Sequence, residues 1–301
     1  GRGKIVSDLR MLLSYQIGDD RSAKVSSGMS IAEMLEDYRP DDYMAPNKHG
    51  FESLISPNNN RAMAYKTMAG KNTTYQVAFS NSNIKYDPLL FAQNIRVRNS
   101  LLLNRFSHQA TDQLSLVFDI GMLQEQGSVL GSVSRGAMEI GRGAKTAFVG
   151  GRFDFKISNS LELFARASYG ITGVEASFSG ILGNISTLKS HSYLIGLKKS
   201  ALFLDNDQLS LTFSQPLLLS GGNASISKVL SRDYVNDAYN MSLERLSLTP
   251  TGRERDIEIS YGVGNLYGRS VRFNVLHQIN PGHIQNIPNA TTFLLRLGSI
   301  F

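Results

Sequence analysis

The sequence predicts an all-β fold, a closed antiparallel transmembrane β-barrel of about twelve strands with a short N-terminal helical or irregular plug segment. Three observations lead to this fold class. Apolar and polar residues alternate through most of the chain after residue 61, connections alternate between short and long, and the last strand alternates up to the final residue. Strands that span a bilayer need only about 9–11 residues and are apolar on one face.

The alternation is clearest in the middle of the chain, where Leu116, Phe118 and Ile120 share one parity and Val117 and Asp119 the other. Such period-two patterning indicates strands with one apolar and one polar face. The twelve candidate strands lie near residues 62–69, 73–80, 114–122, 145–157, 160–172, 190–199, 208–217, 223–228, 240–248, 254–263, 269–278 and 291–301. The stretches 123–144, 173–189 and 279–290 are long connections, whereas 157–160 and 205–208 are tight. Short turns at one end and long loops at the other are typical of a membrane barrel.

Residues 1–60 have weak periodicity and several turn signals, so we expect a linker and lumen or plug segment over 1–60 and the barrel over 61–301. A short helix is expected near residues 28–38. Ser30 is the candidate N-cap and Glu33 completes a capping box. Ile31, Met34 and Leu35 fall on one helix face. This helix is either a small surface helix or a helix inside or beneath the barrel.

The C-terminal strand carries the candidate assembly signal. Its residues share one parity and are Phe293, Leu295, Leu297, Ser299 and Phe301. A strand that ends the chain in Phe resembles the terminal strand of bacterial outer-membrane β-barrels. In that family the assembly machinery reads this strand before it closes the barrel, which removes sheet edges that lipid cannot satisfy. The alternative is an ordinary C-terminal strand of a soluble sandwich.

Composition limits the other classes of protein. Of the 301 residues 42% are hydrophobic and only 19% are charged, below the roughly 25% usual in soluble domains. No run approaches ~18 apolar residues, so no transmembrane helix is expected. The net charge of +6 is scattered among strands, which argues against a nucleic-acid partner. The chain has no Cys, no signal peptide and no initiator Met, so an exported protein is expected to be the C-terminal piece of a longer precursor.

No motif indicates catalysis. Residues 141–146 (GRGAKT) lack the Gly directly before Lys145 that a phosphate-binding loop requires, and strands follow rather than a helix. A Gly-x-Ser-x-Gly elbow is absent, and none of the five His is at metal-ligand spacing. We therefore expect no enzyme activity and no catalytic, cofactor-binding or metal-binding residues.

The second half of the chain resembles the translocator β-domain of autotransporters whose passenger is a subtilisin-like serine protease. Four blocks in register carry the resemblance: IGMLQEQGSVLGS at 120–132, LSLTFSQPL at 209–217 with SGGNAS at 220–225, LTPTGRERD at 248–256, and NPGHI at 280–284. The similarity runs from about 110 to 301 and extends back to about 30. The chain departs from the family in having no Trp, and it lacks the protease's own Asp, His and Ser motifs.

The resemblance implies an outer-membrane domain that anchors an N-terminal passenger and helps export it to the cell surface. The implied partners are outer-membrane lipid and lipopolysaccharide, the barrel assembly machinery and the chain's own passenger, and the implied state is a monomer without cofactor. A barrel of this size admits a helix or an extended chain, not a folded domain. Two alternatives stay open: a passive porin or adhesin barrel, and a soluble β-sandwich binding module.

Overall fold

The computed structural model describes residues 10–35, 50–57, 59–86, 95–134, 136, 139–175, 181–234, 236–266 and 269–299. Within these residues the chain forms sixteen strands and three short helical elements. They are β1 (Met11–Gln16), β2 (Arg21–Ser27), α1 (Ile31–Met34), η2 (Phe51–Leu54), β3 (Asn60–Gly70), β4 (Thr73–Tyr86), β5 (Ile95–Gln109), β6 (Leu114–Gln126), β7 (Gly143–Ser158), β8 (Leu161–Glu175), β9 (Leu182–Gly183), β10 (Leu188–Ser200), β11 (Asp207–Gly221), β12 (Asn223–Asp233), β13 (Ala238–Ser247), β14 (Arg255–Leu266), β15 (Arg269–Ile279), η4 (Pro281–His283) and β16 (Ala290–Ser299). None of the described helices is long and apolar enough to cross a membrane.

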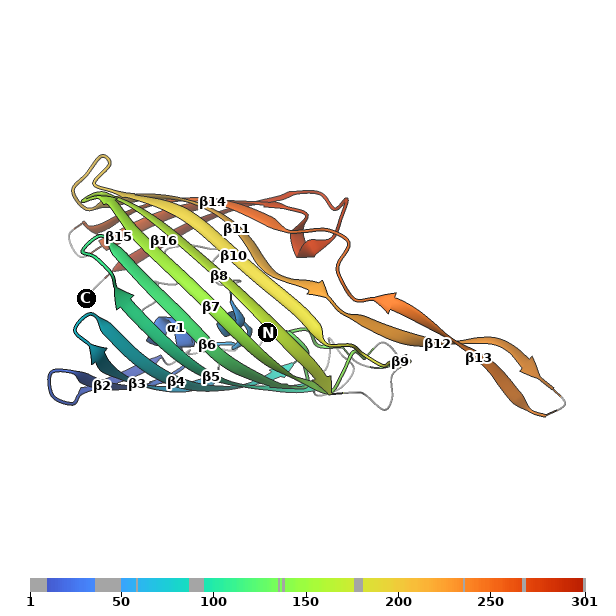
Figure 1. Ribbon diagram of the computed structural model, residues 1–301. Coiled ribbons are helices and arrows are strands. Elements are labelled where there is room, and N and C mark those ends of the chain that lie inside the picture. The colour runs from blue at the N-terminus through green and yellow to red at the C-terminus, as the bar shows by residue number, and fades with distance from the viewer. Residues whose placement is uncertain are drawn as a thin grey trace, which may run out of the picture.

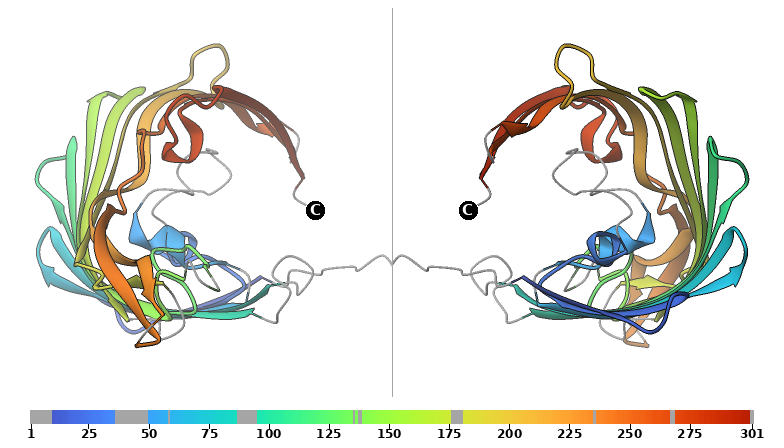
Figure 2. Two further views of the ribbon diagram at one scale, coloured as in Figure 1. Left: turned by 90° about the vertical axis from the view of Figure 1, so that its right-hand side faces the viewer. Right: turned by 90° about the vertical axis from the view of Figure 1, so that its left-hand side faces the viewer.

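Thirteen strands form one antiparallel sheet in the order β1-β2-β3-β4-β5-β6-β7-β8-β10-β11-β14-β15-β16. The strands lie side by side in Figure 1, and Figure 2 shows the same sheet end-on as a curved wall with α1 and η2 on its concave side. We call the concave side of this wall the lumen face and the convex side the outer face. The all-β class expected from the sequence is confirmed.

Two parts of the fold prediction were wrong, the strand count of about twelve and the closed barrel. The described chain has sixteen strands, and β1 and β16 each pair with a neighbour on one side only. The physical reason lies in the edge strands, because β1 has just six residues to offer to a partner. The open edge also leaves Phe293 of β16 66% exposed, compared with 44% for Phe273 on the neighbouring β15.

The strand count failed in two opposite ways. β5 was not predicted because Leu101, Leu102 and Leu103 interrupt its alternation: Leu101 and Leu103 are buried against the lumen side while Leu102 faces outward. The candidates at 223–228 and 240–248 are strands, but they are not part of the wall. They form the hairpin β12–β13, which projects far beyond the end of the sheet (Figure 1). β11 then pairs directly with β14.

The division expected at residue 60 does not coincide with the edge of the sheet. β1 and β2 lie within residues 1–60 and pair in register with β3, for example Val25 opposite Met63. The two strands have only six and seven residues, and β1 is exposed along its whole length, so they give little periodic signal. Of the segment expected as linker and plug, only α1 and η2 with their flanking residues lie on the concave side among the residues that the structure describes.

The connections differ in length at the two ends of the wall, as the sequence indicated. At one end lie the turns 17–20, 71–72, 110–113, 159–160 and 201–206. At the other end β2, β4, β6 and β15 end and β3, β5, β7 and β16 begin, with more residues of the sequence between them, and the β12–β13 hairpin lies there as well. We call these the short-turn end and the long-connection end.

Candidate functional site

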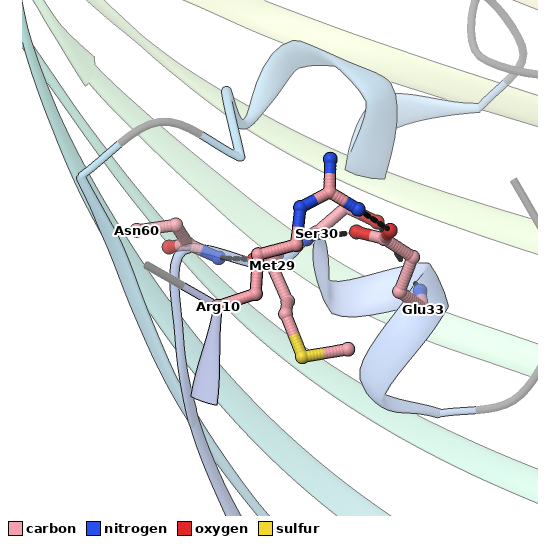
Figure 3. Close-up of polar contacts among 5 residues, drawn as sticks. All are labelled: Arg10, Met29, Ser30, Glu33 and Asn60. Carbon is pink, nitrogen blue, oxygen red and sulfur yellow. Dashed lines mark hydrogen bonds and ion pairs between the residues drawn. The ribbon is translucent and has the colours of Figure 1, made fainter. Parts of the chain in front are cut away.

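The helix α1 is fixed by a complete capping box, which confirms the cap expected from the sequence. Glu33 N–H donates to Ser30 Oγ at 3.2 Å, and Ser30 N–H donates to Glu33 Oε2 at 2.6 Å. Arg10 pairs with Glu33 at 3.1 Å, and Asn60 Nδ2 donates to the Met29 carbonyl at 2.7 Å. Figure 3 shows these contacts joining α1 to the starts of β1 and β3. The helix ends at Met34, and residues 36–38 of the expected helix lie outside the described residues.

The apolar side of this segment packs onto the lumen face of the wall. Ile31 and Met34 are fully buried, and Leu35 packs against the same cluster while partly exposed. Phe51 and Ile55 complete the contact from η2. The wall contributes Ala62, Ala64, Ala78, Leu101, Leu103, Leu123 and Phe148. We call residues 28–35 and 50–57 the lumen segment.

Phe51 is the largest fully buried side chain of the lumen segment. Its ring stacks on Phe148 of β7 with 4.8 Å between ring centroids. Two wall glycines make room for the two rings. A Cβ at Gly170 would lie 2.2 Å from Phe51 Cζ, and a Cβ at Gly121 would lie 2.2 Å from Phe148 Cζ. Glycine inside a strand often marks such a close approach.

Sequence reasoning missed η2, although the signal was present. Phe51, Leu54 and Ile55 have the same i, i+3, i+4 spacing as Ile31, Met34 and Leu35. The stretch is a four-residue 3₁₀ turn preceded by Gly50 in a positive-φ conformation, so it is too short to stand out as a helix.

Polar contacts also hold η2 on the wall. Gly50 N–H donates to Ser192 Oγ at 3.1 Å, and Asn99 Nδ2 donates to the Leu54 carbonyl at 2.8 Å. These two contacts come from β10 and β5, and the stacking partner Phe148 comes from β7. Because three separate wall strands contribute, η2 is held in one position and not merely along one strand.

Glu52 of η2 lies next to a charged pair of the wall and to Arg166 of β8. In that pair, Arg105 of β5 donates two hydrogen bonds of 2.7 Å to Asp119 of β6. Burial raises the pKa of the Glu52 carboxyl, and the Arg166 guanidinium opposes this shift only in part. A cavity of about 30 Å³ adjoins Glu52, Arg105 and Asp119, enough room for about one water molecule. No sequence motif singled out this charged contact, because its members come from four separate elements.

The lumen face changes character from β11 onward. Ser214, Asp256, Glu258 and Asn274 are buried there, and Asn274 Nδ2 donates to Glu258 Oε1 at 2.7 Å. The lumen therefore has an apolar side under the lumen segment and a polar side on β11, β14 and β15.

Three of the four sequence blocks meet at one junction at the long-connection end. His283 Nδ1 accepts from Glu254 N–H at 2.9 Å, while His283 Nε2 donates to the Leu217 carbonyl at 3.1 Å. Gly282 N–H donates to Glu254 Oε2 at 2.6 Å. Gly252 packs so closely that a Cβ would lie 2.7 Å from Gln285 N. The spaced motifs of the sequence thus form a single structural unit beside the β12–β13 hairpin.

The outer face is apolar where the strands cross the middle of the wall. Phe273 is 44% exposed and its neighbour Asn274 is fully buried, so the faces predicted for β15 are confirmed. The C-terminal residues Phe293, Leu295 and Leu297 lie opposite Val275, Phe273 and Val271 on this same outer face. Ser299 ends β16, and Phe301 lies outside the described residues.

No protein-family model matches the chain, and no curated protein matches it. Among solved structures the chain is similar to the CymD monoaromatic hydrocarbon channel, with 10% identity and a TM-score of 0.42 over 82% of this chain and 76% of that chain. It is similar to the Pseudomonas putida toluene transporter TodX, with 11% identity and a TM-score of 0.41 over 78% and 72%. It is also similar to the translocator domain of autotransporter NalP from Neisseria meningitidis, with 14% identity and a TM-score of 0.35 over 96% and 84%. At TM-scores below 0.5 these likenesses carry no argument about function.

The structure itself defines the class of protein. Long antiparallel strands are apolar on the outer face, and on the concave face many buried polar side chains lie beside the lumen segment. An apolar outer band with a polar interior is the pattern of outer-membrane barrels. The outer-membrane location expected from the sequence is confirmed.

Proposed function

We propose that this chain is an outer-membrane translocator domain, which anchors an N-terminal passenger and helps export it to the cell surface. The barrel assembly machinery would insert it, reading the terminal strand. A subtilisin-like protease is the passenger class implied by the sequence resemblance. In this proposal the chain carries the export function and not the proteolysis.

The observation that carries the proposal is where the chain enters and leaves the wall. Ser27 of β2 lies opposite Met11 and Arg61, at the long-connection end, so the chain enters β1 at that end. Ser299 lies opposite Arg269 at the short-turn end, so β16 leaves the wall there. Short turns face the periplasm in outer-membrane barrels. A passenger joined ahead of β1 would therefore lie on the cell-surface side.

This arrangement favours a translocator over a passive porin. A porin-type barrel has an even number of strands, which returns both chain ends to the periplasm. The thirteen-stranded order of the main sheet places them at opposite ends.

The test is export of a reporter. An unstructured epitope tag would be placed directly ahead of Gly1, behind a signal peptide, and the protein expressed in a Gram-negative cell. We expect the epitope to become accessible to protease added to intact cells. An inserted domain whose epitope stays protected in the periplasm would contradict the proposal.

Conductance separates the passive-pore alternative. In planar bilayers the intact chain should conduct weakly, because the lumen segment occupies the lumen face. Deleting residues 1–60 would remove β1 and β2 as well, so the sharper variant is Phe51→Ala with Ile55→Ala, which loosens the lumen segment alone. Equal conductance of this variant and the intact chain would favour a passive porin.

A further inference from the structure

A cluster of four cations lies on the outer face near the long-connection end. Arg61 is on β3, Lys85 on β4, and Arg96 and Arg98 are on β5, and all four side chains are exposed. They share the outward parity of the apolar residues Phe79 and Leu102 on the same strands. We call these four residues the basic cluster.

The strand register places like charges next to each other. Lys85 lies directly opposite Arg96, and Arg98 lies opposite Asn83, two pairs further along. Arg61 lies opposite Asn81 on the other side of β4. Like charges directly opposite each other in an antiparallel pair destabilise it. The arrangement is therefore unfavourable unless an anion lies among the four side chains.

The described residues supply no such anion. No ion pair involving the basic cluster is formed among them, and β3, β4 and β5 contain no Asp or Glu. Elsewhere at the same end an outward cation is paired, since Lys145 of β7 meets Glu175 of β8 at 3.7 Å. Among the described residues, β3–β5 thus place Lys85 opposite Arg96 with no acidic residue on any of the three strands.

The position of the cluster along the strands indicates what supplies the anion. On β5, Arg98 is four residues beyond Leu102, the nearest apolar outward residue. At about 3.4 Å per residue and a strand tilt of about 40°, the Cα atom of Arg98 lies roughly 10 Å above that of Leu102. That is the depth of lipid headgroups, and long side chains can reach across it.

We propose that Arg61, Lys85, Arg96 and Arg98 bind the phosphate groups of lipopolysaccharide in the outer leaflet. This inference rests on the orientation given by the proposed function, with the long-connection end outside. Three of the four residues are arginines, whose planar guanidinium binds phosphate through two parallel hydrogen bonds. A diphosphorylated lipid spanning β3 to β5 would separate the like charges of Lys85 and Arg96 and fix one lipid to the wall.

The test uses the full chain refolded in detergent micelles and titrated with diphosphorylated lipid A. The variant Arg96→Gln with Arg98→Gln removes two charges from the basic cluster. The matched control, Lys66→Gln with Lys71→Gln, removes two exposed cations near the short-turn end. We expect the first variant to bind lipid A at least about tenfold more weakly, since each cation near an anionic surface adds about fivefold. The control should bind within about twofold of the unchanged chain.

A second measurement compares the thermal stability of the double Gln variant and the unchanged chain, first without lipid A and then with it. Without lipid A, the double Gln variant should melt no lower than the unchanged chain, because a repulsive pair is gone. With lipid A, the unchanged chain should gain thermal stability and the variant should gain much less. If the double variant does not refold, Lys85→Gln alone is expected to weaken lipid A binding by about fivefold.

Several results would overturn the proposal. Equal losses of lipid A affinity in the basic-cluster variant and the control would mean that lipid A is attracted only by the overall positive charge of the chain. Equal binding of lipid A without its phosphates would exclude phosphate recognition. Inorganic phosphate alone binding as well as lipid A would indicate a free-anion site instead of a lipid site. No passenger is needed in any arm, so failure here leaves the export test untouched, and failure of export leaves lipid binding measurable.

Discussion

Gly170→Ala tests whether the lumen segment is seated on the wall through Phe51. The added Cβ would lie 2.2 Å from Phe51 Cζ, whereas carbon atoms in contact stay about 3.5–4.0 Å apart. The ring cannot move away freely, because it is fully buried and stacked on Phe148 at 4.8 Å. We expect the variant to lose about 1–3 kcal/mol of unfolding free energy through overpacking.

A double-mutant cycle makes this prediction specific to the ring. Phe51→Ala alone should cost about 3–5 kcal/mol, the usual loss for truncating a buried Phe. Adding Gly170→Ala to it should cost nothing more, because the clashing ring is gone and the methyl fills part of the cavity. The two substitutions should therefore be coupled by about 1–3 kcal/mol.

The measurement is denaturant unfolding of the refolded chain in lipid vesicles, with bilayer conductance as a second readout. Gly173→Ala is the matched control on the same strand, since a Cβ there meets nothing within 4 Å. It should change stability by less than about 0.5 kcal/mol. Equal effects of Gly170→Ala and Gly173→Ala, or a Gly170→Ala penalty that persists without the Phe51 ring, would refute the reasoning.

Glu52, Phe273 and Phe301 each give a further prediction. Because burial raises the pKa of Glu52, its contribution to stability is fully present below the unfolded pKa of about 4.3 and is lost as pH rises through the folded pKa. Stability should therefore fall from acidic toward neutral pH, and Glu52→Gln should flatten that dependence in vesicle unfolding; an unchanged slope would contradict it. Phe273→Arg on the outer face should cost about 2–4 kcal/mol in vesicles, whereas Thr292→Arg, exposed on the lumen face of β16, should cost much less; the reverse order would mean the faces are misassigned. Phe301→Asp should reduce outer-membrane insertion while synthesis continues. Normal insertion in a membrane-fraction assay would contradict the prediction that the terminal strand is an assembly signal.

The burial of Asn274 changes one comparison that the sequence alone favours. The alternation of β15 predicts that Asn274 faces the lumen. In an open, water-filled pore an Arg at this position would cost little stability. In the structure Asn274 is fully buried and bonds to Glu258, so Arg at this position would overpack. Thr292 is the better lumen position for the comparison because its side chain is exposed.

The candidate site was partly predictable. Ser30, Ile31, Met34 and Leu35 were found because a cap followed by i, i+3, i+4 spacing is a local signal. Phe51 and Glu52 were not found, because their importance depends on Phe148, Gly170 and Arg166, which lie far away along the chain. The basic cluster was also invisible to the sequence, since only the register brings Lys85 opposite Arg96.

The sequence by itself determined the all-β class, the outer face of strands such as β6 and β15, and the capped turn at Ser30. Each of these depends on residues a few positions apart, because a side chain on a strand meets lipid or lumen according to its parity. Tertiary structure alone decided that β11 pairs with β14, that β12–β13 leaves the wall, and that β1 and β16 remain edges. Those outcomes depend on pairing between strands that are distant in the sequence. In addition, a strand such as β5 has apolar residues on both faces, which conceals the alternation that predicts a strand.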